Sequence, residues 1–210
     1  KKSDLVLCNY FLEFKKNKIE VKHGYINKDQ YLNDVLSAKI PPSIWNKLIR
    51  LEVYKKNNLL FKEGVNYGED YMLVPQIIYF SDKISSIDMP LYNYIRWNAN
   101  SYTAQIKVSH LNNLIEVCAQ LNKIFEPKVK FNDALTIGFS QKKFDLMRDA
   151  NNFLIFKDIY NKFNIVMVNK EQVFYKFIIF LMKNNFYFIC YLFFFFRRLT
   201  LKLYSAVKGI

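Results

Sequence analysis

The stretch "EGVNYGEDYMLV" (residues 63–74) places an acidic pair, Glu69 and Asp70, between a glycine-containing turn segment and an apolar run. Glycine and asparagine favour turns, and carboxylates are favourable in the first turn of a helix because they face the positive end of its dipole. The stretch therefore predicts a loop that enters a buried helix at this pair. It leaves open whether the two carboxylates only cap the helix or also carry chemistry.

The segments around this pair predict further elements. The apolar run continues to residue 80 as "YMLVPQIIYF", and Pro75 is expected to kink that helix or to restrict its regular part. Upstream, "SIWNKLIRLEVYKKNN" (43–58) has apolar residues at helical spacing and predicts one helix capped by its serine. Downstream, "KISSIDMPLYNYIRW" (83–97) predicts two short extended pieces separated by a Met-Pro step.

The chain changes character near residue 105. Two short strands and a helix are predicted before residue 40, whereas amphipathic helical patterns dominate from about residue 105 onward. We therefore predict an α/β part over residues 1–105 and a mostly helical extension over residues 106–210. Neither a glycine- or serine-rich linker nor an internal repeat marks the boundary.

Composition and charge limit the classes of protein to which this chain can belong. The 210 residues are 51% hydrophobic, which is ample for a buried core, and the formal net charge is +13. Cationic excess is compatible with nucleic acid or with anionic lipid, but the sequence has no recognition-helix signature and no base-stacking strand motif. We therefore expect no nucleic-acid partner. The three cysteines lack disulfide or zinc spacing, which favours a reducing, cytoplasmic setting.

Four short motifs occur in a fixed order over about sixty residues. They are Trp45-Asn46-Lys47-Leu48, Phe61-Lys62-Glu63-Gly64, Gly68-Glu69-Asp70 and the stretch from Asp88 to Thr103. In this order and spacing the chain resembles the C-terminal half of bacterial family 2 glycosyltransferases with the A-type fold. The resemblance implies an α/β fold class: the C-terminal part of an A-type, Rossmann-like glycosyltransferase fold, followed by a mostly helical extension.

The resemblance also implies a chemistry for the acidic pair. Inverting glycosyl transfer requires a base that takes the proton of the acceptor hydroxyl as this hydroxyl attacks the anomeric carbon. By resemblance Asp70 is the candidate base, and Glu69 is its neighbour at the acceptor. A helix that starts at this pair would help to keep the base ionised.

Four further residues are predicted to bind substrate. Trp45 is a candidate wall for the acceptor sugar, or a core residue of its helix, since both uses suit an aromatic ring. Asn46 and Lys47 are expected to hold the loop that carries the acidic pair, or to reach a phosphate. Arg96 is a candidate for neutralising the leaving diphosphate, or a surface residue in an internal salt bridge.

The donor side of such an enzyme is absent from this sequence. Members of the family bind the nucleotide on an N-terminal half of roughly one hundred residues, which is expected to precede Lys1. The Asp-x-Asp motif that holds Mg²⁺ or Mn²⁺ on the donor diphosphate does not occur here. The metal is therefore expected in the complete enzyme and not on this chain alone. No metal ligands are predicted, and His23 and His110 are expected to be structural.

The C-terminal end contains two apolar, aromatic stretches, 177–182 and 186–196, separated by Lys183-Asn184-Asn185. A membrane span needs about 20 apolar residues in a row, and neither stretch is that long. One interpretation is a helix or helical hairpin in the membrane interface; the other is packing on the N-terminal half or on a partner. No acidic residue follows Glu171, and the cations beyond the second stretch are Arg197, Arg198, Lys202 and Lys208.

The function predicted from the sequence is thus inverting transfer from a nucleotide-sugar to a glycan or lipid-linked acceptor, in surface polysaccharide or glycolipid synthesis. The protein would act at the inner face of the cell membrane, in peripheral contact with it. The alternative is a non-catalytic, membrane-associated or partner-binding remnant of such an enzyme.

Overall fold

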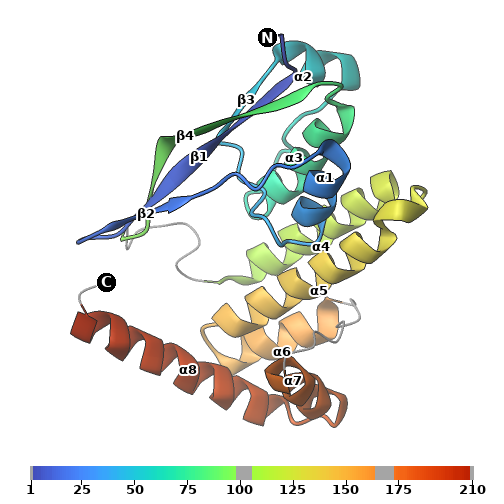
Figure 1. Cartoon of the computed structure of the whole chain (residues 1–210). Coiled ribbons are helices and arrows are strands. Elements are labelled where there is room, and N and C mark those ends of the chain that lie inside the picture. The colour runs from blue at the N-terminus through green and yellow to red at the C-terminus, as the bar shows by residue number, and fades with distance from the viewer. Residues whose placement is uncertain (1, 98–105, 164–172, 209–210) are drawn as a thin grey trace.

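The computed structural model describes residues 2–97, 106–163 and 173–208. It describes the side chains of all these residues except 173–175 and 201–208. The last part of the predicted motif that ends at Thr103 lies outside the described residues, as do the side chains of Lys202 and Lys208. A mixed sheet forms one end of the molecule, and helices pack in successive layers beneath it (Figure 1).

The elements follow the order ββαβααβ and then helices alone. The strands are β1 (Leu5–Glu13), β2 (Lys18–Val21), β3 (Lys47–Ile49) and β4 (Ile84–Ile95). The helices are α1 (Lys28–Leu36), α2 (Leu51–Asn57), α3 (Glu69–Phe80), α4 (Val108–Phe125), α5 (Asn132–Asp149), α6 (Phe153–Lys162), α7 (Val173–Lys183) and α8 (Tyr187–Lys208). The predicted α/β class with a helical second part is confirmed at this level.

β1 is the central strand of the sheet. It pairs in parallel with β4, while β2 and β3 share its other edge as antiparallel partners. β4 is one strand and not the two pieces expected from the sequence, because register shifts on either side of Asn9 accommodate the Met-Pro step: Asn9 pairs with Pro90, and Tyr10 pairs with Tyr92.

The segment 43–58 is not the single helix that its apolar spacing predicts. Residues 43–46 form a turn, β3 follows, and α2 begins only at Leu51. The reason is tertiary: β3 pairs with the first residues of β1, and the backbone N–H of Arg50 donates to the carbonyl of Asp4 at 2.9 Å. Ladder hydrogen bonds and burial against β1 override the helical pattern.

α3 is the buried helix predicted after the acidic pair. It continues through Pro75 as one helix from Glu69 to Phe80, so the expected restriction at the proline does not end it. Val74, Pro75 and Ile77 are all buried, and this packing compensates for the hydrogen bond that a proline cannot donate.

The buried side chains form one cluster that extends from Leu5 in β1 to Phe194 in α8. α1 and α3 form the part of this core nearest the sheet, and the core continues into α4, α5 and α6, which follow residue 105 in the sequence (Figure 1). All described strands precede residue 98, the described residues from 106 onward contain helices and no strand, and the hydrophobic core includes residues of both parts.

α7 and α8 form a helical hairpin: α7 ends at Lys183, and Asn184 and Asn185 lie in the turn between the two helices. Asn185 has a left-handed backbone with φ +62°, which asparagine tolerates better than most residues. Ile178, Cys190 and Phe194 are buried in the hairpin and its contacts with the helices above. Among the described helices, none is long and apolar enough to cross a membrane.

Candidate functional site

A cavity of about 710 Å³ lies between the sheet and the helices. Its lining comes from β1, the loop before β3, the start of α3, the end of β4, and α5. Four of the six predicted site residues line it: Trp45, Glu69, Asp70 and Arg96. The structure thus brings together side chains that three separate motifs contribute.

Asp70 lies in the first turn of α3, where its carboxylate turns back toward the loop before β3. The backbone N–H of Ile44 donates to Asp70 Oδ2 at 3.3 Å. Burial raises the pKa of Asp70, while the Ile44 N–H and the nearby Lys47 ammonium act in the opposite direction. Asp70 is therefore a fixed carboxylate with a proton affinity above that of an ordinary aspartate.

Gly68 caps α3 in a conformation that other residues adopt with difficulty. Its φ is +81°, in the left-handed region, and its carbonyl accepts the hydrogen bond from the backbone of Met72 at 3.0 Å. A Cβ at this position would lie 3.3 Å from Leu114 Cδ1. Backbone conformation and the close approach of α4 together favour glycine directly before the acidic pair.

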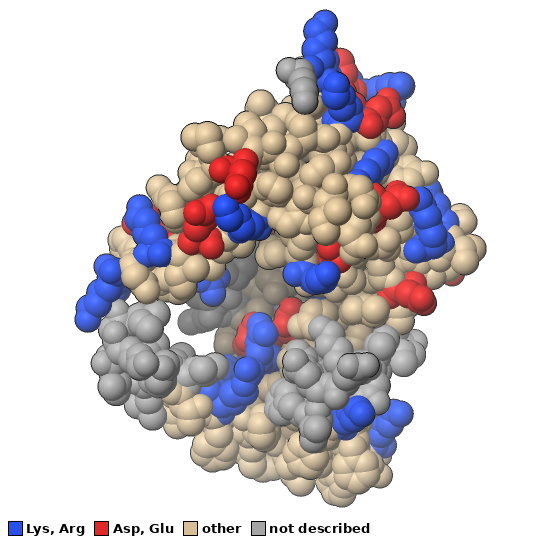
Figure 2. Space-filling model, viewed as in Figure 1, with Lys and Arg blue, Asp and Glu red and all other residues tan. Residues whose placement is uncertain are grey.

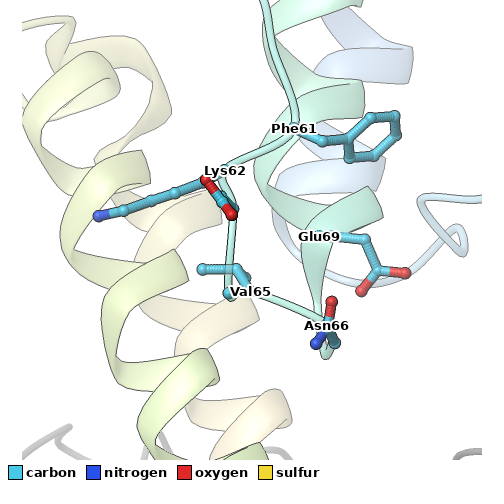
Figure 3. Close-up of a pocket in the computed structure, with 7 residues that line it drawn as sticks. Phe61, Lys62, Val65, Asn66 and Glu69 are labelled. Atoms are coloured by element: carbon cyan, nitrogen blue, oxygen red, sulfur yellow. The ribbon is translucent and has the colours of Figure 1, made fainter.

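Glu69 and Asn66 line both the main cavity and a smaller one of about 400 Å³. The smaller cavity is formed by the loop 61–66, and Figure 3 shows Glu69 beside Asn66 while Lys62 points away toward the helices. Burial raises the pKa of Glu69, and the adjacent Asp70 carboxylate adds to this effect.

α4 holds the loop that leads to the acidic pair. Asn113 Nδ2 donates to the carbonyl of Gly64 at 3.0 Å, and Asn113 Oδ1 accepts from the backbone N–H of Asn66 at 3.1 Å. Lys62 and Glu116 form an ion pair between the same two elements. These contacts fix the loop before α3 begins.

Trp45 belongs to an aromatic cluster at the cavity wall. Its ring stacks on those of Tyr92 and Tyr94, with distances between ring centres of 4.5 Å and 5.2 Å and interplanar angles of 20° and 19°. Tyr10 contacts it edge-on at 4.8 Å. Trp45 is half-buried and lies in a loop, so it is not the core residue of a helix that one interpretation of the sequence required. Such a wall suits the C–H face of a sugar ring.

Asn46 and Lys47 lie behind the loop and are not part of the cavity lining. Asn46 is buried, its Nδ2 donates to the carbonyl of Cys8 at 3.3 Å, and its Oδ1 accepts from Ser43 Oγ at 3.0 Å and Lys47 Nζ at 2.9 Å. Burial lowers the pKa of Lys47 to about 8. The contacts match the loop-holding role, and direct substrate contact by these two residues stays a prediction.

Arg96 follows β4 at the mouth of the cavity. Its backbone N–H donates to the carbonyl of Glu13 at 2.9 Å, and its guanidinium lies 5.9 Å from the centre of the Tyr94 ring. Its side chain makes no hydrogen bond or ion pair with the residues that the structure describes. The internal salt bridge considered from the sequence is therefore not present within that part of the chain.

The sequence analysis missed the contribution of α5. Lys142 and Asp145 line the cavity, together with Tyr67 and Tyr71 near the start of α3. No local signal marks the two α5 residues, because they reach the cavity only through the packing of a helix some seventy residues downstream of the acidic pair.

The described residues contain no group of three or more histidine, cysteine, aspartate and glutamate side chains that fits a metal ion. The two histidines make local contacts: His23 Nδ1 accepts from the backbone N–H of Tyr25 at 2.9 Å, and His110 stacks on Tyr67 at 4.6 Å.

Comparison of the chain with protein-family models, with curated proteins and with solved structures finds no match. The class that the structure itself defines is a mixed α/β protein with a helical second part. Its candidate site is a carboxylate pair at a helix start, facing an aromatic wall and two cationic side chains.

Proposed function

We propose that this chain is the acceptor-side part of an inverting glycosyltransferase with the A-type fold, and that Asp70 is its catalytic base. The observation that carries the proposal is the convergence of Asp70, Glu69, Trp45 and Arg96 on one cavity. These residues come from three motifs that the sequence resemblance linked to this chemistry, and each brings a chemical group that the reaction requires.

The reaction assigns a distinct part to each group. An acceptor hydroxyl attacks the anomeric carbon of the nucleotide-sugar, the bond from that carbon to the diphosphate breaks, and the hydroxyl proton passes to Asp70. The N-terminal end of α3 and the Ile44 N–H orient the carboxylate. Glu69 faces the same cavity, where it accepts hydrogen bonds from other acceptor hydroxyls.

The walls of the cavity supply binding. The Trp45 ring, held by Tyr92 and Tyr94, offers a flat apolar face to the acceptor sugar. The Arg96 guanidinium makes no hydrogen bond or ion pair with the described part of the chain, and this group suits the charge that develops on the leaving diphosphate.

The nucleotide-sugar and its divalent metal belong to the donor half of the complete enzyme. The exposed side of the sheet supports a further packing partner there: β4 pairs only with β1 among the described strands, and apolar side chains near it are exposed. These exposed side chains include Ile87, Met89 and Leu91 of β4. An uncovered strand edge next to apolar residues favours contact with another part of the protein.

The proposal includes peripheral attachment to the inner face of the cell membrane through α7 and α8. The hairpin exposes large apolar side chains, including Phe177, Phe180, Phe186, Phe188, Phe195 and Phe196. In Figure 2 the lower end of the molecule is covered by tan side chains with no acidic side chain at its edge. Aromatic side chains with flanking cations are typical of helices that lie in an anionic interface.

A second candidate is a non-catalytic remnant that binds a membrane or a partner protein. It is favoured by the exposed apolar side chains of α7 and α8, which suit contact with a membrane or a partner protein without any transfer step. The two candidates differ in whether the protein binds and consumes a nucleotide-sugar.

The test is nucleoside diphosphate release by the protein isolated at its native length from its host, incubated with a panel of nucleotide-sugars, Mg²⁺ or Mn²⁺, and host lipid extract. The proposal predicts metal-dependent release with one donor, accompanied by a labelled glycan or glycolipid product. Absence of both release and donor binding across the panel would overturn it in favour of the remnant.

A further inference from the structure

Lys142 reaches the cavity from α5, on the helix face that also carries Gly138 and Asp145. Its ammonium lies 4.9 Å from the centre of the Tyr71 ring and contributes to the lining. Burial lowers the pKa of Lys142. An ammonium in this position has lost most of its hydration, and the cation–π contact and the nearby charge of Asp145 compensate for only part of that loss.

The ammonium of Lys142 has no hydrogen-bond acceptor and no ion-pair partner among the described residues, although the charge of Asp145 is near enough to favour its charged form. Asp145, one turn further along α5, lines the same cavity but accepts hydrogen bonds from Arg148 Nη1 at 2.9 Å and from Gln141 Nε2 at 2.8 Å. No carboxylate of the described chain forms an ion pair with Lys142. The N–H donors of the Lys142 ammonium are therefore available to a ligand in the cavity.

Two other lysines with lowered pKa values show what a protein-satisfied ammonium looks like in this fold. Lys143 donates to the carbonyl of Tyr160 at 3.3 Å, and Lys47 donates to Asn46 Oδ1 at 2.9 Å. Both have protein acceptors, whereas Lys142 faces the cavity with no acceptor from the described residues. The difference identifies Lys142 as a ligand-binding side chain.

We propose that Lys142 binds a phosphate group of the ligand that occupies this cavity. Arg96, which lines the cavity from the end of β4, brings a second cation that makes no ion pair with the described residues. The carboxylates of Glu69, Asp70 and Asp145 line the same cavity, so a phosphate would have to bind at the two cations and away from these groups. The proposal rests on the proposed function for the nature of the rest of the ligand. The phosphate has two chemical sources: the diphosphate of a nucleotide-sugar, or the phosphate that links an acceptor sugar to a lipid.

The test measures binding by calorimetry on the native-length protein, without any transfer step. The probes are methyl glucoside, glucose 1-phosphate and uridine diphosphate, and the variants are Lys142→Met and Lys157→Met. Methionine keeps the apolar stem that packs on Tyr71, and the exposed Lys157 on α6 controls for the loss of one positive charge.

The wild type is expected to bind at least one phosphate probe tenfold or more tightly than methyl glucoside, and Lys142→Met to abolish that preference while Lys157→Met retains it. If Lys142→Met loses affinity for glucose 1-phosphate alone, the phosphate belongs to the acceptor. If it loses affinity for uridine diphosphate, the phosphate belongs to the donor. Unchanged affinities in Lys142→Met, or no preference for phosphate in the wild type, would overturn the proposal.

The Tm of thermal unfolding is a second measurement, and it would change if Lys142 had a structural role. Because Lys142→Met removes a dehydrated, unpaired charge, its Tm is expected to equal or exceed that of the wild type. A lower Tm with intact phosphate binding would make Lys142 a structural residue. Loss of phosphate binding leaves the proposed transfer untested, since that is decided by donor consumption and by Asp70.

Discussion

Replacing Gly138 with alanine tests how α5 reaches the cavity. Gly138 lies where α5 crosses the end of α1, and an added Cβ would overlap the carbonyl oxygen of Leu36 and the hydroxyl of Tyr71. These two groups already share a hydrogen bond, which the Tyr71 hydroxyl donates. Since Lys142 lies one turn further on the same face, this close contact determines how near its ammonium comes to the site.

The expected loss of stability follows from three effects. Overpacking a buried site costs about 1–3 kcal/mol, and disruption of the Tyr71–Leu36 hydrogen bond costs about 1 kcal/mol. Alanine in place of glycine inside a helix returns about 1 kcal/mol. Gly138→Ala is therefore expected to lower the free energy of unfolding by about 2 kcal/mol.

The assay is urea denaturation followed by tryptophan fluorescence, with Thr136→Ala as the matched control on α5. Thr136 is exposed and its Oγ1 donates to the carbonyl of Asn132 at 2.9 Å, so its replacement changes helix propensity without adding volume at the contact. The control is expected to be neutral or slightly stabilising. If Gly138→Ala behaves like the control, α5 does not approach α1 as described, and the placement of Lys142 is wrong.

Three further predictions concern the site and the hairpin. Burial raises the pKa of Asp70 and the Lys47 ammonium lowers it, so as the pH falls, transfer activity should be lost at a pH above the usual pKa of an aspartate. Lys47→Met should move this loss of activity to higher pH, and a pH–rate profile in which it does not move would contradict the prediction. Gly68→Ala imposes a left-handed φ on alanine and should cost about 1–2 kcal/mol in a denaturation experiment, together with most of the activity; wild-type stability would refute the geometry at the start of α3. Replacing Phe188 and Phe196 by serine should reduce sedimentation with vesicles of phosphatidylglycerol and phosphatidylcholine by tenfold or more without lowering Tm, because both side chains are exposed, and equal sedimentation would argue against membrane contact.

Elements whose residues are buried by nearby partners were predictable from the sequence. α3 and α4 carry apolar patterns that match their buried faces, and the acidic pair lies at the start of α3 as its turn and apolar run indicated. The loop at Trp45 was not predictable, because the apolar spacing of residues 43–58 fits a helix equally well. Only the pairing of β3 with β1 decides otherwise.

The candidate site shows the same division. Residues close to the short motifs could be named, and Asp70, Trp45 and Arg96 do line one cavity. Lys142 could not be named, because its importance depends on the close contact of Gly138 with α1 and on the engagement of Asp145 by other groups. Helix-to-helix distances and competition among charges are tertiary facts that no local pattern records.

The most direct test of the central claim is the rate of sugar transfer by native-length protein carrying Asp70→Asn. Asparagine keeps the size of the side chain but cannot accept the hydroxyl proton, and loss of a general base lowers a rate by about 10²–10⁴-fold. If Asp70 is the catalytic base, kcat should fall by a factor of this size while the fold and phosphate binding are retained. Transfer at the wild-type rate would show that Asp70 is not the base and that the carboxylate pair only caps α3.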